Sequence, residues 1–476
     1  MKSGAGRCEG IRRWMTVILG VFILLQPVFD ILTSLGVHAG HTLTVGTVVR
    51  PVFMAAAVFY LVFLSRFQEK RQCLMVLGAL LLYLLVFLAH LFFQGGLSLC
   101  LANIRELVKV YFAPFVALFL FAVYRENGSR VPNWAIAGAG ALYAGTILLA
   151  FLTGTSGTSY LNSGYGFKGW FYAANEVSDI LALTVPVVLC TCLTQLCKCR
   201  GKGWWKGVPV ALVLVSVVFS TTYLGTKVVF GISLLYCVAA AVWCAVNLVR
   251  ARTRMHIVGT VLFSALTLSI AVSYFSSPLM SYLENVYVPT VDEDVSHNRP
   301  GESDEEEPWD ELFDPDGVLL LELIEHNRVV RTVDSVLSHR LTTAAYSVQE
   351  YLESGIGAKL LGIGYANAPG YTHDVEKMIE VDPLALLVRQ GVVGFAMYYL
   401  PYLGFILYVV VSFFRKPGKR MSSLVYCSYL YPTLVAAGIS VVAGHALVTP
   451  SVSIFVLAIS SNLWIMTREQ DALQAQ

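Results

Sequence analysis

Two carboxylates, Glu380 and Asp382, stand where a polar stretch of the chain meets an apolar one. A glycine-rich segment, 362–370, and a run of charges precede them, and an apolar segment, 383–413, follows at once. Carboxylates at the border of a membrane are costly unless they are paired or functional. A carboxylate can accept the proton of a hydroxyl group in a transfer reaction. We therefore hypothesise that Glu380 is a general base and that Asp382 orients the acceptor or pairs with a cation.

A purely structural interpretation fits the same two residues. Asp382 directly precedes Pro383, and an aspartate followed by a proline is typical of a helix N-terminus. A negative charge there also interacts favourably with the helix dipole. In this alternative, the two carboxylates only cap the helix that follows.

Several basic residues offer a positive counterpart to these carboxylates. Arg50 and Arg389 fall inside apolar segments, and Asp30 is a candidate partner for Arg50. Others lie in or beside segments that we place on the outer side of a membrane below: Arg105, Lys109, Lys168, Lys227, Arg328, Arg331 and Arg340. Together they suit a phosphate or pyrophosphate, because guanidinium groups hold phosphate oxygens bidentately. The alternatives are snorkelling of single side chains to the interface and, for Arg105 with Glu106 and Lys109, pairing on one helix surface.

The composition is that of a membrane protein. Of the 476 residues, 56% are apolar and 13% are charged, about half the charge fraction of a soluble protein. The mean hydropathy is +0.66. Apolar runs of about 18 or more residues recur along the chain, and each is long enough to cross a bilayer as a helix. We predict an all-α, polytopic integral membrane protein.

The apolar segments predict twelve membrane spans. They are 14–35, 43–65, 73–94, 107–124, 132–153, 173–196, 207–223, 226–248, 256–275, 383–413, 422–446 and 450–467. The N-terminal segment and alternate loops are basic and, with Arg468, hold 21 of the 33 Lys and Arg residues. The positive-inside rule then places both termini, including a tail at 468–476, in the cytoplasm.

One long loop, 276–382, separates spans nine and ten on the outer side. It divides a first membrane segment, 1–275, from a second, 383–467, and it contains 22 of the 31 acidic residues. Its part 291–317 is too acidic and too poor in apolar residues to fold alone, which predicts a mobile insert. The part 318–353 has apolar residues at helical spacing, which predicts amphipathic helices over the outer membrane face.

Metal and cofactor sites are not indicated. Cys190, Cys192, Cys197 and Cys199 form a C-x-C-x4-C-x-C run, but no histidine is near them and they belong to a helix end. The oxygen spacing in 291–317 matches no known calcium loop. There is no P-loop, dinucleotide fingerprint, zinc-protease motif or nucleophile elbow. We therefore expect a metal-independent protein with no cofactor. We also expect no nucleic-acid partner, because the basic residues follow membrane topology.

The order of these features resembles the O-antigen ligase and polysaccharide polymerase superfamily. The matching pieces are Gly169–Leu189, the turn Leu224–Lys227, and the blocks Ser338–Arg340, Leu360–Ala366 and Glu380–Phe395. Ligases of this family usually have a histidine eleven residues before the first glycine of G-x-x-G, where this chain has Glu380. The chain is therefore more similar to a subgroup with E-x-D in place of the histidine, which favours a polymerase over a ligase.

The resemblance implies a fold, a reaction and a set of partners. The fold is a helical bundle of the polyprenyl-dependent glycosyltransferase (GT-C-like) type. The reaction moves or polymerises an undecaprenyl-diphosphate-linked oligosaccharide onto an acceptor glycan or cell-surface polymer, at the outer face of the bacterial cytoplasmic membrane. The partners are thus the lipid-linked glycan, the acceptor and membrane lipid.

The resemblance also assigns roles by position. Lys227 and Arg340 correspond to the cations that hold the donor diphosphate, and Arg331 and Lys168 join them as donor-binding residues. Asn175, Arg105 and Tyr365 are expected to bind substrate. Glu380 and Asp382 are the expected catalytic residues.

The alternative function is a transporter or flippase for a lipid-linked or anionic glycan. A transporter is expected to carry broken or charged helices near the bilayer midplane, often with internal symmetry. Arg50 and Arg389 lie nearer the outer ends of their spans than the middle, and no internal repeat is visible. The enzyme is therefore the leading interpretation.

The substitution Glu380→Gln tests the assignment of the base. It removes the proton-accepting carboxylate and keeps the side-chain shape, so we expect impaired glycan transfer in a cell-based assay at normal protein levels. Unimpaired transfer at normal protein levels would show that Glu380 is not the base.

Overall fold

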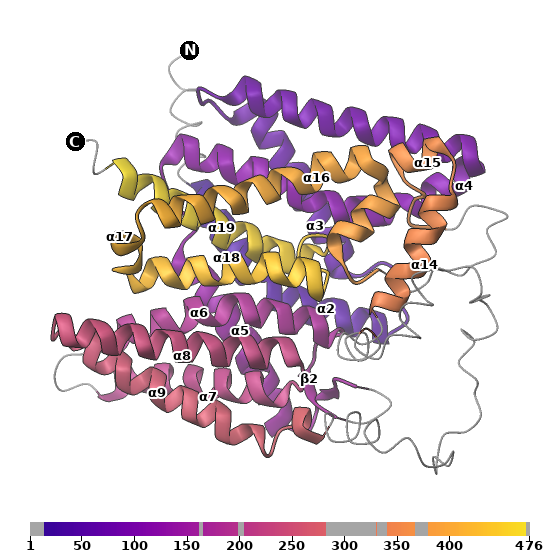
Figure 1. Ribbon diagram of the computed structural model, residues 1–476. Coiled ribbons are helices and arrows are strands. Elements are labelled where there is room, and N and C mark those ends of the chain that lie inside the picture. The colour runs from indigo at the N-terminus through magenta and orange to yellow at the C-terminus, as the bar shows by residue number, and fades with distance from the viewer. Residues whose placement is uncertain are drawn as a thin grey trace, which may run out of the picture.

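The computed structural model describes residues 14–160, 165–198, 204–281, 330, 340–366 and 379–472. These residues are almost all helical (Figure 1), and the sheet among them has two antiparallel strands, β1 (Gly157–Thr158) and β2 (Phe167–Gly169). In chain order, the helices are Trp14–Leu24, α2 (Gln26–His38), α3 (Val45–Phe59), the π-helix η1 (Tyr60–Leu64), α4 (Lys70–Asn127), α5 (Asn133–Leu152), α6 (Ala174–Lys198), the short 3-10 helix η2 (Trp204–Gly207), α7 (Val208–Tyr223), α8 (Lys227–Arg250), α9 (Arg254–Tyr274), α14 (Arg340–Glu353), α15 (Ile356–Leu361), α16 (Asp382–Arg415), α17 (Pro417–Met421), α18 (Leu424–Val442) and α19 (Pro450–Ala472).

The helices are those of a polytopic membrane protein, as predicted. Nine of the described helices are long and apolar enough to cross a membrane, or ten if Trp14–Leu24 and α2, which are bent by 44°, form one span. A helix covers most of each of the twelve predicted spans. A total of twelve also requires α4 to cross twice and the 16-residue α7 to cross once, and that number stays a prediction.

The 58-residue α4 folds back on itself. Gly95 and Gly96 have non-helical backbone angles, and Gly96 has a φ of 70° that glycine adopts without strain. A straight helix of this length would separate its ends by about 85 Å. Instead, Arg125 near its end forms an ion pair with Glu69 at its start. The element therefore consists of two antiparallel arms, as the path of the ribbon in Figure 1 shows.

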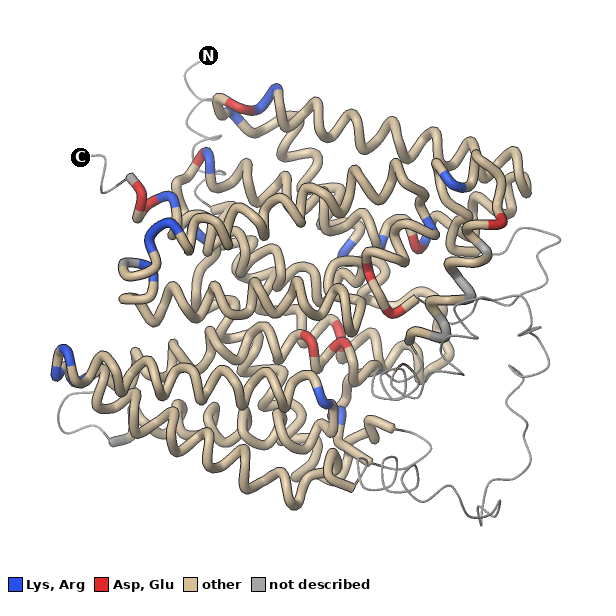
Figure 2. Tube along the Cα trace, viewed as in Figure 1, with Lys and Arg blue, Asp and Glu red and all other residues tan. Residues whose placement is uncertain are grey.

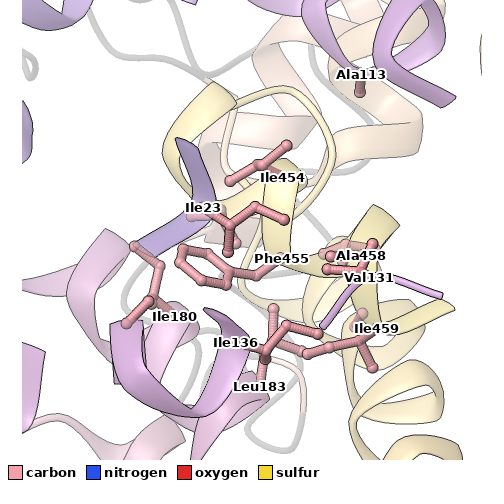
Figure 3. Packing of buried hydrophobic residues seen from close by; sticks show 14 of the residues in the cluster. Ile23, Ala113, Val131, Ile136, Ile180, Leu183, Ile454, Phe455, Ala458 and Ile459 are labelled. Carbon is pink, nitrogen blue, oxygen red and sulfur yellow. The ribbon is translucent and has the colours of Figure 1, made fainter. Parts of the chain in front are cut away.

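The last helix of the chain lies at the centre of the bundle. In α19, 83% of the most apolar window is buried inside the protein, compared with 17% in the helix that begins at Val45. Phe455 of α19 packs between Ile23 of the first helix and Ile180 of α6 (Figure 3). Apolar contacts from the beginning, the middle and the end of the sequence thus meet on one helix.

Close packing of α5 on α6 depends on small residues. The α5 segment is rich in alanine and glycine, and Ala135 and Ala139 are fully buried. A Cβ added at Gly140 would come within 2.6 Å of the Thr184 hydroxyl. Helices in lipid associate through such close van der Waals packing, because lipid is as apolar as the helix surface.

The two ends of the bundle differ in charge. At one end, basic side chains cluster and pair with acids: Arg125 with Glu69, Arg130 with Glu469, and Lys416 and Arg420 with Asp471. Figure 2 shows Lys, Arg, Asp and Glu residues gathered at this end, where α17 lies and α19 ends. We call this the basic end. The bend of α4 and the starts of α3, α6, α8, α16 and α19 lie at the opposite end.

Two short helices of the predicted long loop pack at the opposite end. α14 falls within the predicted amphipathic part, 318–353, and α15 follows it. The loop after α15 binds α16 through backbone hydrogen bonds, from Ile363 N–H to Val388 O (3.1 Å) and from Gly364 N–H to Arg389 O (3.0 Å). The acidic insert, 291–317, lies outside the described residues.

The helix at the predicted span 383–413 is interrupted. Gly391 in α16 has φ 67° and ψ −179°, which ends one helical stretch and starts another. A Cβ at this position would meet the carbonyl group of Leu360 and the amide of Gly362. The break lets the chain after α15 approach α16 closely, and this tertiary contact is what the local sequence pattern does not reveal.

The substitution Gly391→Ala should destabilise the protein. An alanine would be strained at this positive φ, which costs about 1–3 kcal/mol, and its Cβ would also meet backbone atoms. The matched control is Gly404→Ala in the same helix, where a Cβ has no neighbour within 4 Å. Thermal unfolding of the purified protein should show a lower Tm for Gly391→Ala and an unchanged or higher Tm for the control. Equal Tm values for the two variants would contradict this account.

Candidate functional site

A cavity of about 630 Å³ lies at the end of the bundle opposite the basic end. Its walls come from α2 and α3, the second arm of α4, the start of α6, and the turn between α18 and α19. The charged and polar residues of the lining are Asp30, Thr33, Thr44, Thr47, Arg50, Arg105, Glu106, Lys109, Asn175, Glu176, His445, Thr449 and Ser451. Such a mixture of fixed charges beside apolar walls is typical of a ligand site.

Arg50 is the best anchored cation of this cavity. Its Nη2 binds Asp30, and its Nε and Nη2 both donate to Gln26 Oε1, at 3.2 and 3.1 Å. Tyr143 donates a hydrogen bond to the other Asp30 oxygen. The predicted pairing of Arg50 with Asp30 is therefore confirmed. Because these partners hold the guanidinium rigidly, it faces the cavity in a fixed position.

The second arm of α4 adds further charges. Lys109 Nζ lies 2.6 Å from Glu106 Oε1, so the predicted pairing on a helix surface is found for these two residues. Arg105 is exposed, lines the cavity and has no ion pair with a described residue. Its charge is thus available to an anionic ligand.

The start of α6 forms another wall of the cavity. Asn175 and Glu176 both line it, and Glu176 Oε2 accepts a hydrogen bond of 2.6 Å from the Ser451 hydroxyl of α19. The structure therefore brings two predicted substrate-binding residues, Asn175 and Arg105, to one cavity, although they are 70 positions apart.

Asp382 lies beside this cavity but is fully buried. Its Oδ1 accepts a hydrogen bond from His445 N–H (2.6 Å), and its Oδ2 accepts one from Leu447 N–H (2.8 Å). The N-cap of α16 is Val381, and the Asp382 side chain binds the α18–α19 turn instead. This geometry is that of a residue that positions a turn.

Glu380 lies against the same turn and is half-buried. A Cβ added at Gly444 would meet the Glu380 backbone carbonyl, which shows how closely the two segments approach. The two predicted catalytic residues thus lie next to His445, which itself lines the cavity.

His445 is a site residue that the sequence reasoning did not find. It is the one non-glycine residue with a positive φ (64°) in the part of the chain that the structure describes. This conformation arises from contacts with α16, and nothing in the local sequence indicates it. The one sequence feature that could have indicated His445 as a site residue is weak: it is a polar residue in the turn before an apolar helix.

Two of the predicted donor-binding cations lie outside the cavity lining. Lys168 on β2 donates to Tyr172 O at 2.8 Å, and Tyr172 lines the cavity. Lys227 is the first residue of α8 and directly follows the turn at Leu224. The β-hairpin contacts this turn, because the Ser159 hydroxyl donates a hydrogen bond of 2.6 Å to Leu224 O. The hairpin therefore brings the segments of Lys168 and Lys227 together.

The remaining predicted residues fall elsewhere. Tyr365 is held in a polar network in which the Gln390 amide donates to its hydroxyl oxygen at 2.6 Å and Asn103 accepts from its backbone N–H. Burial raises the pKa of the Tyr365 phenol above its ordinary value. Arg331 lies outside the described residues, and Arg340 begins α14 with a side chain that is not described.

The described residues contain no group of three or more His, Cys, Asp or Glu side chains that could hold a metal ion. Cys190, Cys192 and Cys197 of the predicted cysteine run belong to α6 as free thiols. Cys199 lies outside the described part of the chain.

These observations define the class of the protein: it is a polytopic helical membrane protein with a charged cavity at one end of its bundle. The model of the family described as O-antigen ligase like membrane protein matches residues 13–470. The chain therefore belongs to this family, which confirms the resemblance that its motifs carry. No curated protein matches the chain.

Family membership sets the function at a coarse level. The chain is a glycosyltransferase-like membrane enzyme with a ligase- or polymerase-type role in glycan assembly. Its substrates belong to the general classes of lipid-linked glycan and acceptor polysaccharide.

The substitution Asp382→Asn should destabilise the protein. The Asn side chain has one acceptor oxygen, so one of the two backbone N–H donors would face an NH2 group, a loss of about 1–3 kcal/mol. Chemical unfolding in detergent measures this, with the exposed Glu353→Gln of α14 as a charge-matched control. If Asp382→Asn were as stable as the control, the carboxylate would not be what holds the turn.

Proposed function

We propose that this protein moves or polymerises an undecaprenyl-diphosphate-linked oligosaccharide at the outer face of a bacterial cytoplasmic membrane. The single observation that supports this best is the cavity, with Arg50, Arg105 and Lys109 in its wall. A diphosphate carries several negative charges, and fixed cations stabilise the charge that develops on it when it leaves. The reaction needs only positioned side chains and is proposed to proceed without a metal.

The charge difference between the two ends supports this orientation. Cytoplasmic loops of membrane proteins are enriched in Lys and Arg, and such residues cluster at the basic end. If the basic end faces the cytoplasm, the cavity opens toward the outer side. The proposal therefore includes cytoplasmic termini, twelve spans and the division of the chain into 1–275, the outer loop 276–382, and 383–467.

Arg50 and Arg105 suit different parts of the donor site. Arg50 has two fixed partners and keeps its position, so it can hold one phosphate without losing side-chain entropy on binding. Arg105 is exposed and can move onto the ligand. In the proposal, Lys168, Lys227, Arg331 and Arg340 extend this positive region around the cavity and attract the lipid-linked anion.

Glu380 and Asp382 have separate roles in the proposal. Glu380 is half-buried beside the cavity turn and serves as the base that receives the proton released by the acceptor hydroxyl. Asp382 fixes the turn through two backbone N–H groups. Asn175, next to Glu176 in the cavity wall, is placed to bind sugar hydroxyls. Glu380 in place of the ligase histidine favours polymerisation.

A deletion strain of the source organism tests the function. Loss of the gene should shorten or remove a cell-surface polysaccharide, and the intact gene should restore it. The variant Arg105→Gln should restore at most about one tenth of the polymer that the intact gene restores, because a charge-assisted hydrogen bond of about 1.5–3 kcal/mol is lost. The control is Lys359→Gln in α15, which removes a charge at the same end of the bundle but outside the cavity lining.

The polymer is measured by gel analysis of extracted polysaccharide at equal protein levels. A deletion that leaves every surface polysaccharide unchanged would contradict the proposed function. Equal polymer from Arg105→Gln and the control would contradict the proposed role of the cavity cation.

A further inference from the structure

His445 has a conformation that a histidine adopts only under constraint. Its φ is 64°, and the residue before it, Gly444, has φ 68°. Positive φ is uncommon for residues other than glycine. Such residues cost about 1–3 kcal/mol and persist only where surrounding contacts fix them. A glycine at 445 would avoid this cost, so the turn itself does not require an imidazole.

The contacts that fix His445 come from three directions. Asp382 accepts hydrogen bonds from His445 N–H and Leu447 N–H, at 2.6 and 2.8 Å. Tyr398 donates to Leu447 O at 2.8 Å. Gly444 lies against the Glu380 backbone so closely that a Cβ there would meet its carbonyl. Two buried side chains of α16 and one backbone contact therefore hold the turn 444–447, and with it the backbone of His445, in place.

The held residue lies in the wall of the cavity. His445 lines it together with Asn175, Glu176 and Ser451, and the cations of α3 and α4 belong to the same lining. A neutral imidazole is a good proton acceptor near pH 7. The structure thus holds a proton acceptor rigidly in a cavity whose other walls carry the charges for a diphosphate.

We propose that His445 is a catalytic residue that contacts the acceptor hydroxyl. Its imidazole accepts the hydroxyl proton while the acceptor oxygen forms a bond to the anomeric carbon of the donor glycan. The bond from that carbon to the phosphate oxygen breaks, and the polyprenyl diphosphate leaves with the electron pair. Glu380, beside the turn, stabilises the imidazolium and then receives the proton from it, so that the imidazole is neutral again for the next transfer. The proposal rests on the proposed function and adds the residue that first takes the proton.

The test uses two variants that keep the turn and remove the imidazole. Glycine adopts positive φ without strain, and asparagine tolerates it better than most residues do. His445→Gly and His445→Asn should therefore fold, and the melting temperature of each purified variant checks this. We expect at least about 100-fold less polymer than the intact gene gives in the deletion strain, the usual scale for loss of a general base. Stabilisation of the purified variants by inorganic pyrophosphate should equal that of the unchanged protein, because the cations of the cavity remain.

The outcomes separate the inference from the proposed function. If the intact gene restores the polymer and either variant restores it to within about threefold, His445 is not catalytic and the proposed function stands. A loss of pyrophosphate stabilisation in both variants would also overturn the inference, since His445 would then shape the cavity and not take a proton. If the intact gene restores no polymer, the proposed function itself fails.

Discussion

The cavity of this protein depends on one buried carboxylate. Asp382 begins α16, and its two oxygens bind backbone N–H groups of the turn between α18 and α19, more than 60 residues later. A buried carboxylate requires such partners, because an unpaired one is strongly unfavourable in a membrane protein. The contact therefore joins the start of α16 to the turn that leads into the central helix α19. It also fixes the wall that carries His445 and Ser451.

The same principle explains the other polar groups in the bundle. Arg50 is balanced by Asp30 and Gln26, and Asp30 also receives the hydroxyl of Tyr143. These groups come from three helices, α2, α3 and α5, so their pairing also fixes the relative positions of those helices. In the proposed function, binding of a lipid-linked anion then needs little reorganisation, and the fixed charges stabilise the leaving diphosphate. The closely packed α5–α6 pair and the central α19 supply the rigid support.

The sequence predicted what depends on composition and on local pattern. Apolar length located the helices, and charge type suggested the Arg50–Asp30 pair. The family resemblance assigned Arg105 and Asn175 to substrate binding, and both line the cavity. The sequence did not predict that α19 is central, since core-facing and lipid-facing surfaces are equally apolar. It also missed the break at Gly391 and the role of His445, because both result from backbone contacts between distant segments. Arg331 and the insert 291–317 lie outside the described residues.

The central claim is that the cavity binds the lipid-linked donor, and photo-crosslinking in cells tests it most directly. A photoreactive amino acid replaces Thr449, which lines the cavity, and in a second protein it replaces Val249, which is 87% exposed at the basic end. Irradiation should give an adduct that contains polyprenyl diphosphate and glycan at Thr449, and none at Val249. Adducts of equal yield at both positions, or none at Thr449 in a protein that still makes polymer, would contradict the account.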